Sequence, residues 1–191
     1  MDSTIDAYEQ KASLYRERTD SAMPTDLSQW LNTSLSGLDT SAKVFEIGSG
    51  TGRDASYLKR LGYRVQVSDV ASSFISMLEE AGWDAVRFDV VEDELDGVWD
   101  LVFADAVLLH LSRKEFALSL QKTHAHLADN GRFAFTLKAG EGEAYSNEKL
   151  GMPRFFCYWQ AGDVADRLEA AGYSSWIIDE HPGWIHVVAH K

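Results

Sequence analysis

The feature that most constrains the fold is the segment 44–54, in which apolar residues lead through one acidic residue into three alternate glycines. Gly48, Gly50 and Gly52 allow the backbone to turn tightly and leave no side chain between it and a ligand. A helix predicted to begin at Arg53 presents unpaired backbone N–H groups in its first turn. The segment therefore predicts a strand, a turn and a helix that receive a nucleotide-like ligand at the carboxyl end of a parallel strand.

Strand-like and helix-like segments alternate through the rest of the chain, and glycines close several of the helices. We predict strands at 44–47, 63–68, 83–87, 99–104, 132–137, 174–179 and 184–189, and helices at 54–61, 72–81, 112–127 and 161–171. Repeated strand–helix units predict a parallel sheet with helices on both faces. Pro182-Gly183 predicts a closing hairpin. The expected fold is a doubly wound α/β domain, whose mostly parallel seven-stranded sheet takes one antiparallel strand from this hairpin.

The chain length of 191 residues predicts a single domain over 1–191. Its first 37 residues are expected to form a helical lid, with helices at 3–17 and 25–35. Residues 139–159 are predicted to be irregular and to form a substrate lid after the fifth strand, because long irregular segments in compact domains are usually functional. The alternative, in which Phe155–Trp159 is a strand of the core, stays open.

Composition limits the function classes. The net charge of −12 disfavours nucleic acid as a partner, because phosphates are bound by basic surfaces, although a local basic groove could escape this average. No apolar run reaches the ~20 residues that cross a bilayer. Acidic residues near the N-terminus are not typical of a secretory signal. The lone cysteine, Cys157, excludes an internal disulfide, so we expect a cytoplasmic protein, as a monomer or homodimer.

Three acidic residues stand at or just after the ends of the first three predicted strands. Asp69 follows Gly52 by 17 residues, where a carboxylate can accept both hydroxyls of a ribose. Asp89 could accept a hydrogen bond from the exocyclic amine of adenine. Glu46 would repel a pyrophosphate but suits a ligand that carries an ammonium group. This set favours S-adenosylmethionine over NAD as the cofactor.

These motifs resemble those of class I S-adenosylmethionine-dependent methyltransferases. The matching residues are Val44–Asp54, Val65–Asp69, Phe88-Asp89, Trp99–His110 and Asn130–Phe135, and Asp129-Asn130-Gly131 stands where the family usually has Pro-Gly-Gly. Further likeness points to a bacterial small-molecule subgroup that is loosely similar to tellurite and thiopurine methyltransferases. Its residues are Gly52-Arg53-Asp54, Leu108-Leu109-His110, Lys138 and Gly140–Glu143.

The resemblance implies a role for each of twelve residues at the cofactor. The methionine moiety is expected at Glu46 and the glycine turn, the ribose at Asp69 and the adenine at Asp89, with Tyr15 closing the N-terminal helix over the ligand. The complete expected set is Tyr15, Glu46, Gly48, Ser49, Gly50, Gly52, Arg53, Asp69, Val70, Asp89, Val90 and Ala104.

Four residues are candidates for substrate contact or proton transfer: His110, Asp105, Arg154 and Tyr158. His110 and Asp105 follow the fourth strand, where an α/β sheet binds ligands. Transfer of an activated methyl group depends mainly on alignment, so a general base is needed only for a protonated nucleophile of high pKa. No metal-ligand set is predicted. Two alternatives stay open: an NAD-binding oxidoreductase and a non-catalytic S-adenosylmethionine-binding module.

Overall fold

The computed structural model describes residues 2–19 and 23–191. Met1 and residues 20–22 belong to the expected helical segment 1–37 but lie outside the described residues. The strands are β1 (Val44–Glu46), β2 (Val65–Asp69), β3 (Ala85–Arg87), β4 (Trp99–Ala104), β5 (Leu127–Ala139), β6 (Glu143–Ser146), β7 (Arg154–Trp159), β8 (Ser175–His181) and β9 (Trp184–His190). The helices are α1 (Asp2–Thr19), α2 (Thr25–Leu35), α3 (Arg53–Arg60), α4 (Ser72–Glu80), α5 (Arg113–His126) and α6 (Ala161–Ala170), with a 3₁₀ turn η1 (Leu108–His110).

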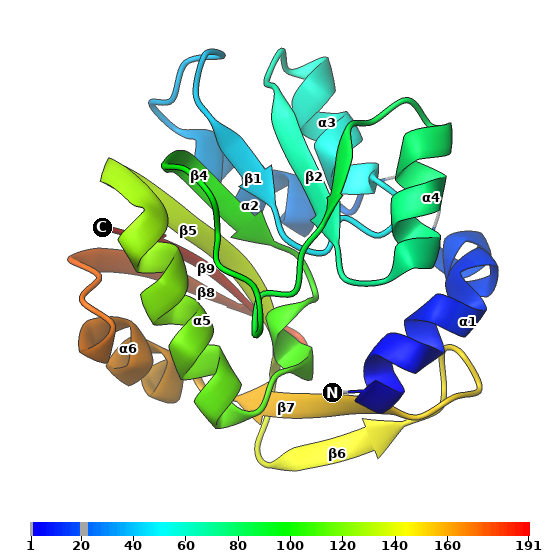
Figure 1. The fold of residues 1–191 in the computed structure, drawn as a ribbon. Helices are drawn as coiled ribbons and strands as arrows, with labels where there is room; N and C mark the ends of the chain where they lie inside the picture. Colours follow the sequence, from blue (N-terminus) through cyan, green and yellow to red (C-terminus); the bar gives the residue numbers. More distant parts are fainter. Residues whose placement is uncertain (1, 20–22) are drawn as a thin grey trace.

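The sheet confirms the predicted doubly wound α/β class. Strands β3, β2, β1, β4 and β5 lie side by side in this order and run parallel. The C-terminal hairpin β8–β9 adds β9 antiparallel to β5, as the Pro-Gly turn predicted (Figure 1). Because parallel strands end at the same edge, the carboxyl ends of β1, β2 and β4 meet along one side of the sheet.

Alternate side chains of β4 enter two hydrophobic layers, because successive residues of a strand face opposite sides of the sheet. Leu101 and Phe103 pack with α2 and α3, while Val102 and Ala104 belong to the larger cluster that includes α5 and α6. Helices therefore cover both faces (Figure 1). Burial on both faces explains why β4 is the most continuously apolar strand of the sequence.

The prediction that residues 139–159 are irregular is wrong. This segment contains the antiparallel hairpin β6–β7, and β7 pairs with the end of β5 through Lys138 and Tyr158. The sheet therefore has nine strands rather than seven. Aromatic and β-branched residues favour strands, and β7 buries Phe156 and Trp159 in the core, as the open alternative expected.

A turn at Asn130 lies within β5, and the strand is longer than the predicted 132–137. Asn130 has a φ of +64°, and the pairing of β4 with β5 jumps from Leu127 to Arg132 across this turn. A capping box begins α5, because Ser112 and Glu115 exchange side-chain and backbone hydrogen bonds.

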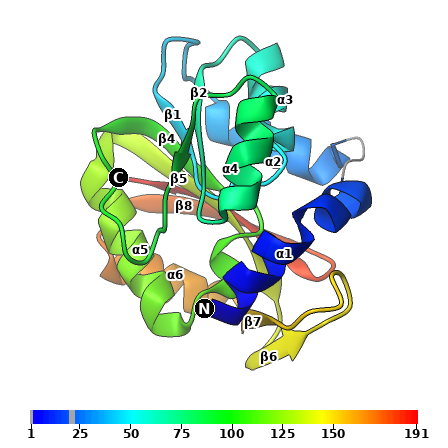
Figure 2. The ribbon, with the colours of Figure 1, turned by 45° about the vertical axis from the view of Figure 1, so that its right-hand side comes forward.

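Helix α1 lies against α4 and β7, at the edge where the parallel strands end (Figure 2). Tyr8 and Tyr15 pack with Phe74 of α4, with ring centroids 5.4–6.1 Å apart. This aromatic contact places the N-terminal helix over the site described below. No helix within the described ranges is long and apolar enough to cross a membrane.

Candidate active site

A cleft opens at the carboxyl ends of the parallel strands. The space within it measures about 740 Å³, part of which is open solvent. The glycine turn, the ends of β2 and β4, and α1 contribute to its wall. Seven residues of the expected cofactor set line it: Tyr15, Gly48, Gly50, Asp69, Val70, Asp89 and Val90.

The glycine turn has the backbone that its sequence predicts. Gly48, Gly50 and Gly52 have φ of +68°, +54° and +78°, values that side-chain-bearing residues rarely adopt. A Cβ on Gly48 would lie 2.4 Å from Cγ2 of Val107, so this glycine also permits close packing against the loop after β4. Ser49 fixes the turn to β2, because its N–H donates to the carbonyl of Ser68 at 2.7 Å.

Asp69 joins the end of β2 to the glycine turn. Its Oδ2 accepts a hydrogen bond from the N–H of Gly50 at 3.0 Å, and its Oδ1 accepts one from Ala71 at 2.9 Å. Burial raises the pKa of Asp69 to about 6, although these backbone bonds oppose the shift. Each carboxylate oxygen has a second lone pair, so the group can still accept hydroxyl donors from the cleft.

Asp89 also lines the cleft and is 8% exposed. Its Oδ1 accepts the backbone N–H of Val91 at 2.9 Å, and its own N–H donates to Asp93 at 2.8 Å. The turn after β3 therefore holds this carboxylate at the cleft, beside Val90 and Phe88.

Glu46 does not line the cleft but lies directly before two residues that do, Ile47 and Gly48. Its carboxylate is 2% exposed, and Oε2 has no hydrogen-bond partner among the described residues. Burial, together with the nearby charge of Asp54, raises the pKa of Glu46 well above its ordinary value. A cationic donor would stabilise the ionised form of this group.

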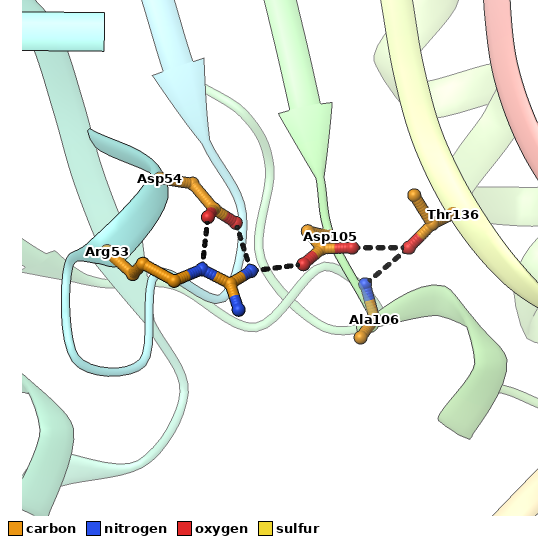
Figure 3. Close-up of polar contacts among 5 residues, drawn as sticks. All are labelled: Arg53, Asp54, Asp105, Ala106 and Thr136. Carbon is orange, nitrogen blue, oxygen red and sulfur yellow. Dashed lines mark hydrogen bonds and ion pairs between the residues drawn. The ribbon is translucent and has the colours of Figure 1, made fainter. Parts of the chain in front are cut away.

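Arg53, Asp54 and Asp105 form an ion-pair network (Figure 3), and their charges act on Glu46. Arg53 donates through Nε to Asp54 at 2.7 Å and through Nη2 to Asp105 at 2.8 Å. Asp105 also accepts the hydroxyl of Thr136 at 2.6 Å, so both of its carboxylate oxygens are engaged. With Glu46, this region holds three carboxylates for one guanidinium, and burial raises the pKa of Asp54 to about 6.

The residue after Asp105 is backbone-strained. Ala106 has a φ of +56°, which is uncommon for a residue with a Cβ, and its N–H donates to Oγ1 of Thr136 at 2.8 Å. Ala106 lines both the cleft and a second cavity beside it. Backbone strain of this kind is typical of functional sites. The hydrogen bond between Asp105 and Thr136 helps to keep Ala106 in its strained backbone conformation.

His110 is buried in a directional chain of hydrogen bonds. Its Nδ1 lies 2.5 Å from the carbonyl oxygen of Phe155, which can only accept, so Nδ1 carries the proton. Its Nε2 therefore accepts the phenol proton of Tyr8, 2.8 Å away. Nη1 of Arg154 donates to the same phenol oxygen at 3.2 Å. Burial lowers the pKa of His110 to about 4, so the ring is neutral at physiological pH.

The second cavity adjoins the cleft and encloses about 990 Å³, part of it open to solvent. Tyr8, Tyr15, Ala106 and His110 line both spaces. Three other groups give the second cavity its chemistry: the cations Lys138, Lys149 and Arg154, the aromatic residues Phe156, Tyr158 and Trp184, and the exposed acid Glu148.

The predicted site residues thus divide into three groups. Seven of the cofactor set line the cleft, while Glu46, Ser49, Gly52, Arg53 and Ala104 do not; Ala104 is fully buried at the end of β4. Asp105 lines the cleft, Arg154 and Tyr158 line the second cavity, and His110 lines both. Sequence reasoning missed Tyr8, Asp54, Phe74, Thr136 and Lys149 as parts of the site. A tyrosine at Tyr8 on an amphipathic helix looks like any other core aromatic, so no signal marked it.

Comparison with known proteins identifies the domain. A family model described as a methyltransferase domain matches residues 16–176. A comparison with curated protein sequences returned no match. Among solved structures, DhpI in complex with SAH is 23% identical, with a TM-score of 0.80 over 98% of this chain and 95% of that one.

Two further solved structures are similar over nearly the whole chain. The 1,6-didemethyltoxoflavin-N1-methyltransferase of Burkholderia thailandensis is 19% identical, with a TM-score of 0.72 over 98% of this chain and 87% of that one. The CcbJ methyltransferase of Streptomyces caelestis is 17% identical, with a TM-score of 0.72 over 96% of each chain. The family match decides against the NAD-binding oxidoreductase, and the chain belongs to the methyltransferase domain family as an S-adenosylmethionine-dependent enzyme of the class I fold.

Proposed function

We propose that this enzyme transfers a methyl group from S-adenosylmethionine to an oxygen, nitrogen or sulfur nucleophile of a small molecule by direct displacement. The observation that carries the proposal is the placement of three buried carboxylates beside one cleft: Asp69 and Asp89 line it, and Glu46 lies directly before the lining residues Ile47 and Gly48. Glu46, Asp69 and Asp89 stand at or just after the ends of three neighbouring strands, and an oxygen of Glu46 has no partner among the described residues.

Each carboxylate suits a different part of the cofactor. Asp69 would accept the ribose hydroxyls, and Asp89 would accept the adenine amine between Val70 and Val90. The unpartnered oxygen of Glu46 would accept the ammonium group of the methionine moiety, with Arg53 and Asp54 as neighbouring charges. At Gly48 and Gly50 the ligand would lie against main-chain atoms, because neither residue has a side chain. Tyr15 would cover the ligand there, because its ring is close to Gly50: a Cβ on Gly50 would be only 3.7 Å from the ring.

The bound cofactor supplies an activated methyl group on a sulfonium sulfur, so the protein's main contributions are alignment and exclusion of water. The rings of Tyr8, Tyr15 and Phe74 pack against one another at the junction of α1 and α4 and close the cleft on that side. We therefore retain the N-terminal helices as a lid. We also retain the segment 139–159, now a hairpin, as a wall of the substrate cavity, since Arg154, Phe156 and Tyr158 line it.

Proton removal, where the substrate needs it, fits Tyr8 and His110 better than Asp105. Both oxygens of Asp105 already accept hydrogen bonds from Arg53 and Thr136. We propose that Asp105 is a positioning residue that holds the strained loop at Ala106. Neutral His110 presents an acceptor nitrogen to Tyr8, and Tyr8 lines both cavities, so a substrate proton could pass toward His110 through the phenol, although the low pKa of His110 makes it a weak base.

A small-molecule acceptor is supported by the size of the second cavity and by the nature of one structural neighbour. The toxoflavin methyltransferase was solved with 1,6-didemethyltoxoflavin bound, which is a small molecule. The net charge of −12 disfavours nucleic acid. The cytoplasm remains the expected location, because the chain has a single cysteine.

The direct test is methylation of a metabolite extract with S-adenosylmethionine that carries a labelled methyl group. We expect label in a low-molecular-weight product with the wild-type protein, and little or none with Asp69→Asn. Lys114→Gln, a change of one charge on exposed α5, serves as the control and is expected to label normally. Label in protein or RNA, with none in small molecules, would contradict the proposed substrate class.

A further inference from the structure

The second cavity concentrates positive charge in an acidic protein. Lys138, Lys149 and Arg154 all line it, although the whole chain carries a net charge of −12. None of the three forms an ion pair with a described residue. The acid in the lining, Glu148, is exposed and likewise forms no ion pair with any residue that the structure places. No ion pair within the described part of the chain therefore neutralises the charges of this cluster.

Arg154 is the most deeply buried member of this cluster. It is 5% exposed, and its guanidinium lies 5.1 Å from the ring centroid of Phe156. One of its nitrogens donates to Tyr8, whereas Nε is buried without a partner among the described residues. Burying a guanidinium costs free energy unless an anion or enough acceptors compensate it, so this arrangement is incomplete without a ligand.

Aromatic rings hold the two lysines at the same cavity. Nζ of Lys149 lies 4.3 Å from the ring centroid of Tyr15, and Nζ of Lys138 lies 3.9 Å from that of Trp184. Burial, together with the charges of Arg154 and Arg53, lowers the pKa of Lys149 to about 8. Burial and Arg154 also lower the pKa of Lys138. The cations thus repel one another, and a bound anion would relieve this repulsion.

We propose that the second cavity binds an oxyanion of the methyl-accepting substrate, so that the acceptor is a small molecule bearing a phosphate-type or carboxylate group. Arg154 would donate hydrogen bonds to two oxygens of the oxyanion, because a guanidinium matches such groups in geometry. Lys138 and Lys149 would neutralise the remaining negative charge. Phe156 and Trp184 would contact the apolar part of the molecule. This inference rests on the proposed function, since it assigns the substrate side of the same site.

The site can be tested with simple probes before the natural substrate is found. Phenylphosphonate, benzoate and neutral benzamide are titrated by calorimetry into protein saturated with S-adenosylhomocysteine. We expect at least one of the two anions to bind and benzamide to bind at least about tenfold more weakly, because charge-assisted hydrogen bonds are the strong ones. The two anions distinguish a tetrahedral from a planar oxyanion. Equal binding of benzamide, or binding of neither anion, would overturn the proposal.

Variants locate the anion. Arg154→Gln and Lys149→Gln are each expected to lower the affinity for the anion at least about tenfold. The affinity for S-adenosylhomocysteine should stay within about twofold of the wild-type value. Lys149→Gln guards against misfolding, because Lys149 is only half-buried and, apart from its contact with the ring of Tyr15, its side chain forms no hydrogen bond or ion pair with a described residue. Lys114→Gln removes the same charge from an exposed position and should change neither affinity. Unchanged anion affinity in both cavity variants would overturn the proposal.

Competition separates this inference from the proposed function. If the anions displaced S-adenosylhomocysteine, the cations would serve the carboxylate of the cofactor, and the inference would be wrong. The anions are also titrated into cofactor-free protein. Loss of S-adenosylhomocysteine binding with retained anion binding would contradict the cofactor assignment and leave the anion site standing. Cofactor binding without any anion binding would contradict the anion site alone.

Discussion

The phenol oxygen of Tyr8 lies 2.8 Å from Nε2 of His110, although 102 residues separate them in the chain. The contact joins α1 to the loop after β4, and Arg154 of β7 donates to the same oxygen at 3.2 Å. Three segments that are distant in sequence therefore meet at one hydroxyl, between the cofactor cleft and the second cavity. The donor directions follow from the carbonyl of Phe155, which can only accept from His110.

This chain of hydrogen bonds predicts the protonation state of His110. Burial is the main reason that its pKa falls to about 4, so we expect a neutral ring from pH 5 to 8 with the proton on Nδ1. Nitrogen-15 NMR of the histidine side chains measures both properties, with His110→Gln used to assign the signal. A midpoint above pH 6, or a proton on Nε2, would contradict a hydrogen-bond chain that runs from Tyr8 through His110 to Phe155.

Removing the hydroxyl of Tyr8 should destabilise the fold. Tyr8→Phe leaves Nε2 of His110 and a nitrogen of Arg154 each without a hydrogen-bond partner, at a cost of about 1–3 kcal/mol for a buried group. Tyr145→Phe is the matched control, because Tyr145 is 64% exposed and its hydroxyl makes no hydrogen bond to any described residue. Chemical denaturation measures both, and equal effects on the free energy of unfolding would count against the contact.

The glycine turn predicts a difference between two glycines of similar backbone. Gly48→Ala places a Cβ 2.4 Å from Val107, whereas Gly82→Ala, at a similar positive φ, meets nothing within 4 Å. Both changes add backbone strain of roughly 1–2 kcal/mol, so the excess loss in Gly48→Ala reports the clash. Thermal denaturation measures it, and Val107→Ala combined with Gly48→Ala should recover part of the loss. Equal losses in the two single variants would contradict the close packing.

Asp69 predicts how cofactor binding depends on pH. Its pKa is raised from the ordinary 3.8 to about 6, so the ligand-free protein protonates it as the pH falls through 6. A protonated carboxyl is a poorer acceptor for ribose hydroxyls, and we expect the affinity for S-adenosylhomocysteine to fall by up to about tenfold per pH unit below 6. Calorimetry from pH 5 to 8 measures this dependence.

The variant Asp69→Asn isolates this group, because an amide does not titrate. Its affinity should be lower at pH 8 and should change less with pH. The raised pKa also means that folding takes up a proton at Asp69 between about pH 3.8 and 6. The contribution of Asp69 to stability is therefore lost as the pH rises through this window, and Asp69→Asn removes that part of the pH dependence. A pH profile that is the same in both proteins would exclude Asp69 as its source.

The parallel strands and the C-terminal hairpin could be predicted from the sequence because short sequence patterns determine them locally. The apolar run of β4, the glycines with positive φ and the Pro-Gly turn each fix a short piece of backbone, and the βαβ rule then orders the strands. The hairpin β6–β7 could not be predicted in the same way. Residues 143–146 of β6 are mostly exposed and carry no apolar alternation, and they become a strand only by pairing with β7.

The site could be predicted only in part, for a related reason. The location of Asp69 and Asp89 at the cleft could be predicted because parallel strands bring their carboxyl ends to one edge. Tyr8 and Lys149 reach the same place through the docking of α1 and the path of the loop before β7, which no local pattern records. Ala104 is buried at the end of β4, and the next two residues, Asp105 and Ala106, line the cleft.

Glu46 provides the most direct test of how the cofactor lies in the cleft, because it is assigned the ammonium group alone. Calorimetry compares S-adenosylhomocysteine with 5′-methylthioadenosine, which lacks the amino-acid moiety, in wild type, Glu46→Gln and Asp69→Asn. We predict that Glu46→Gln lowers the affinity for S-adenosylhomocysteine at least about tenfold and leaves the affinity for 5′-methylthioadenosine within about twofold. Asp69→Asn should lower the affinity for both ligands. Wild-type protein that binds neither ligand, or a Glu46→Gln variant that loses both equally, would contradict the placement of the cofactor across these strand ends.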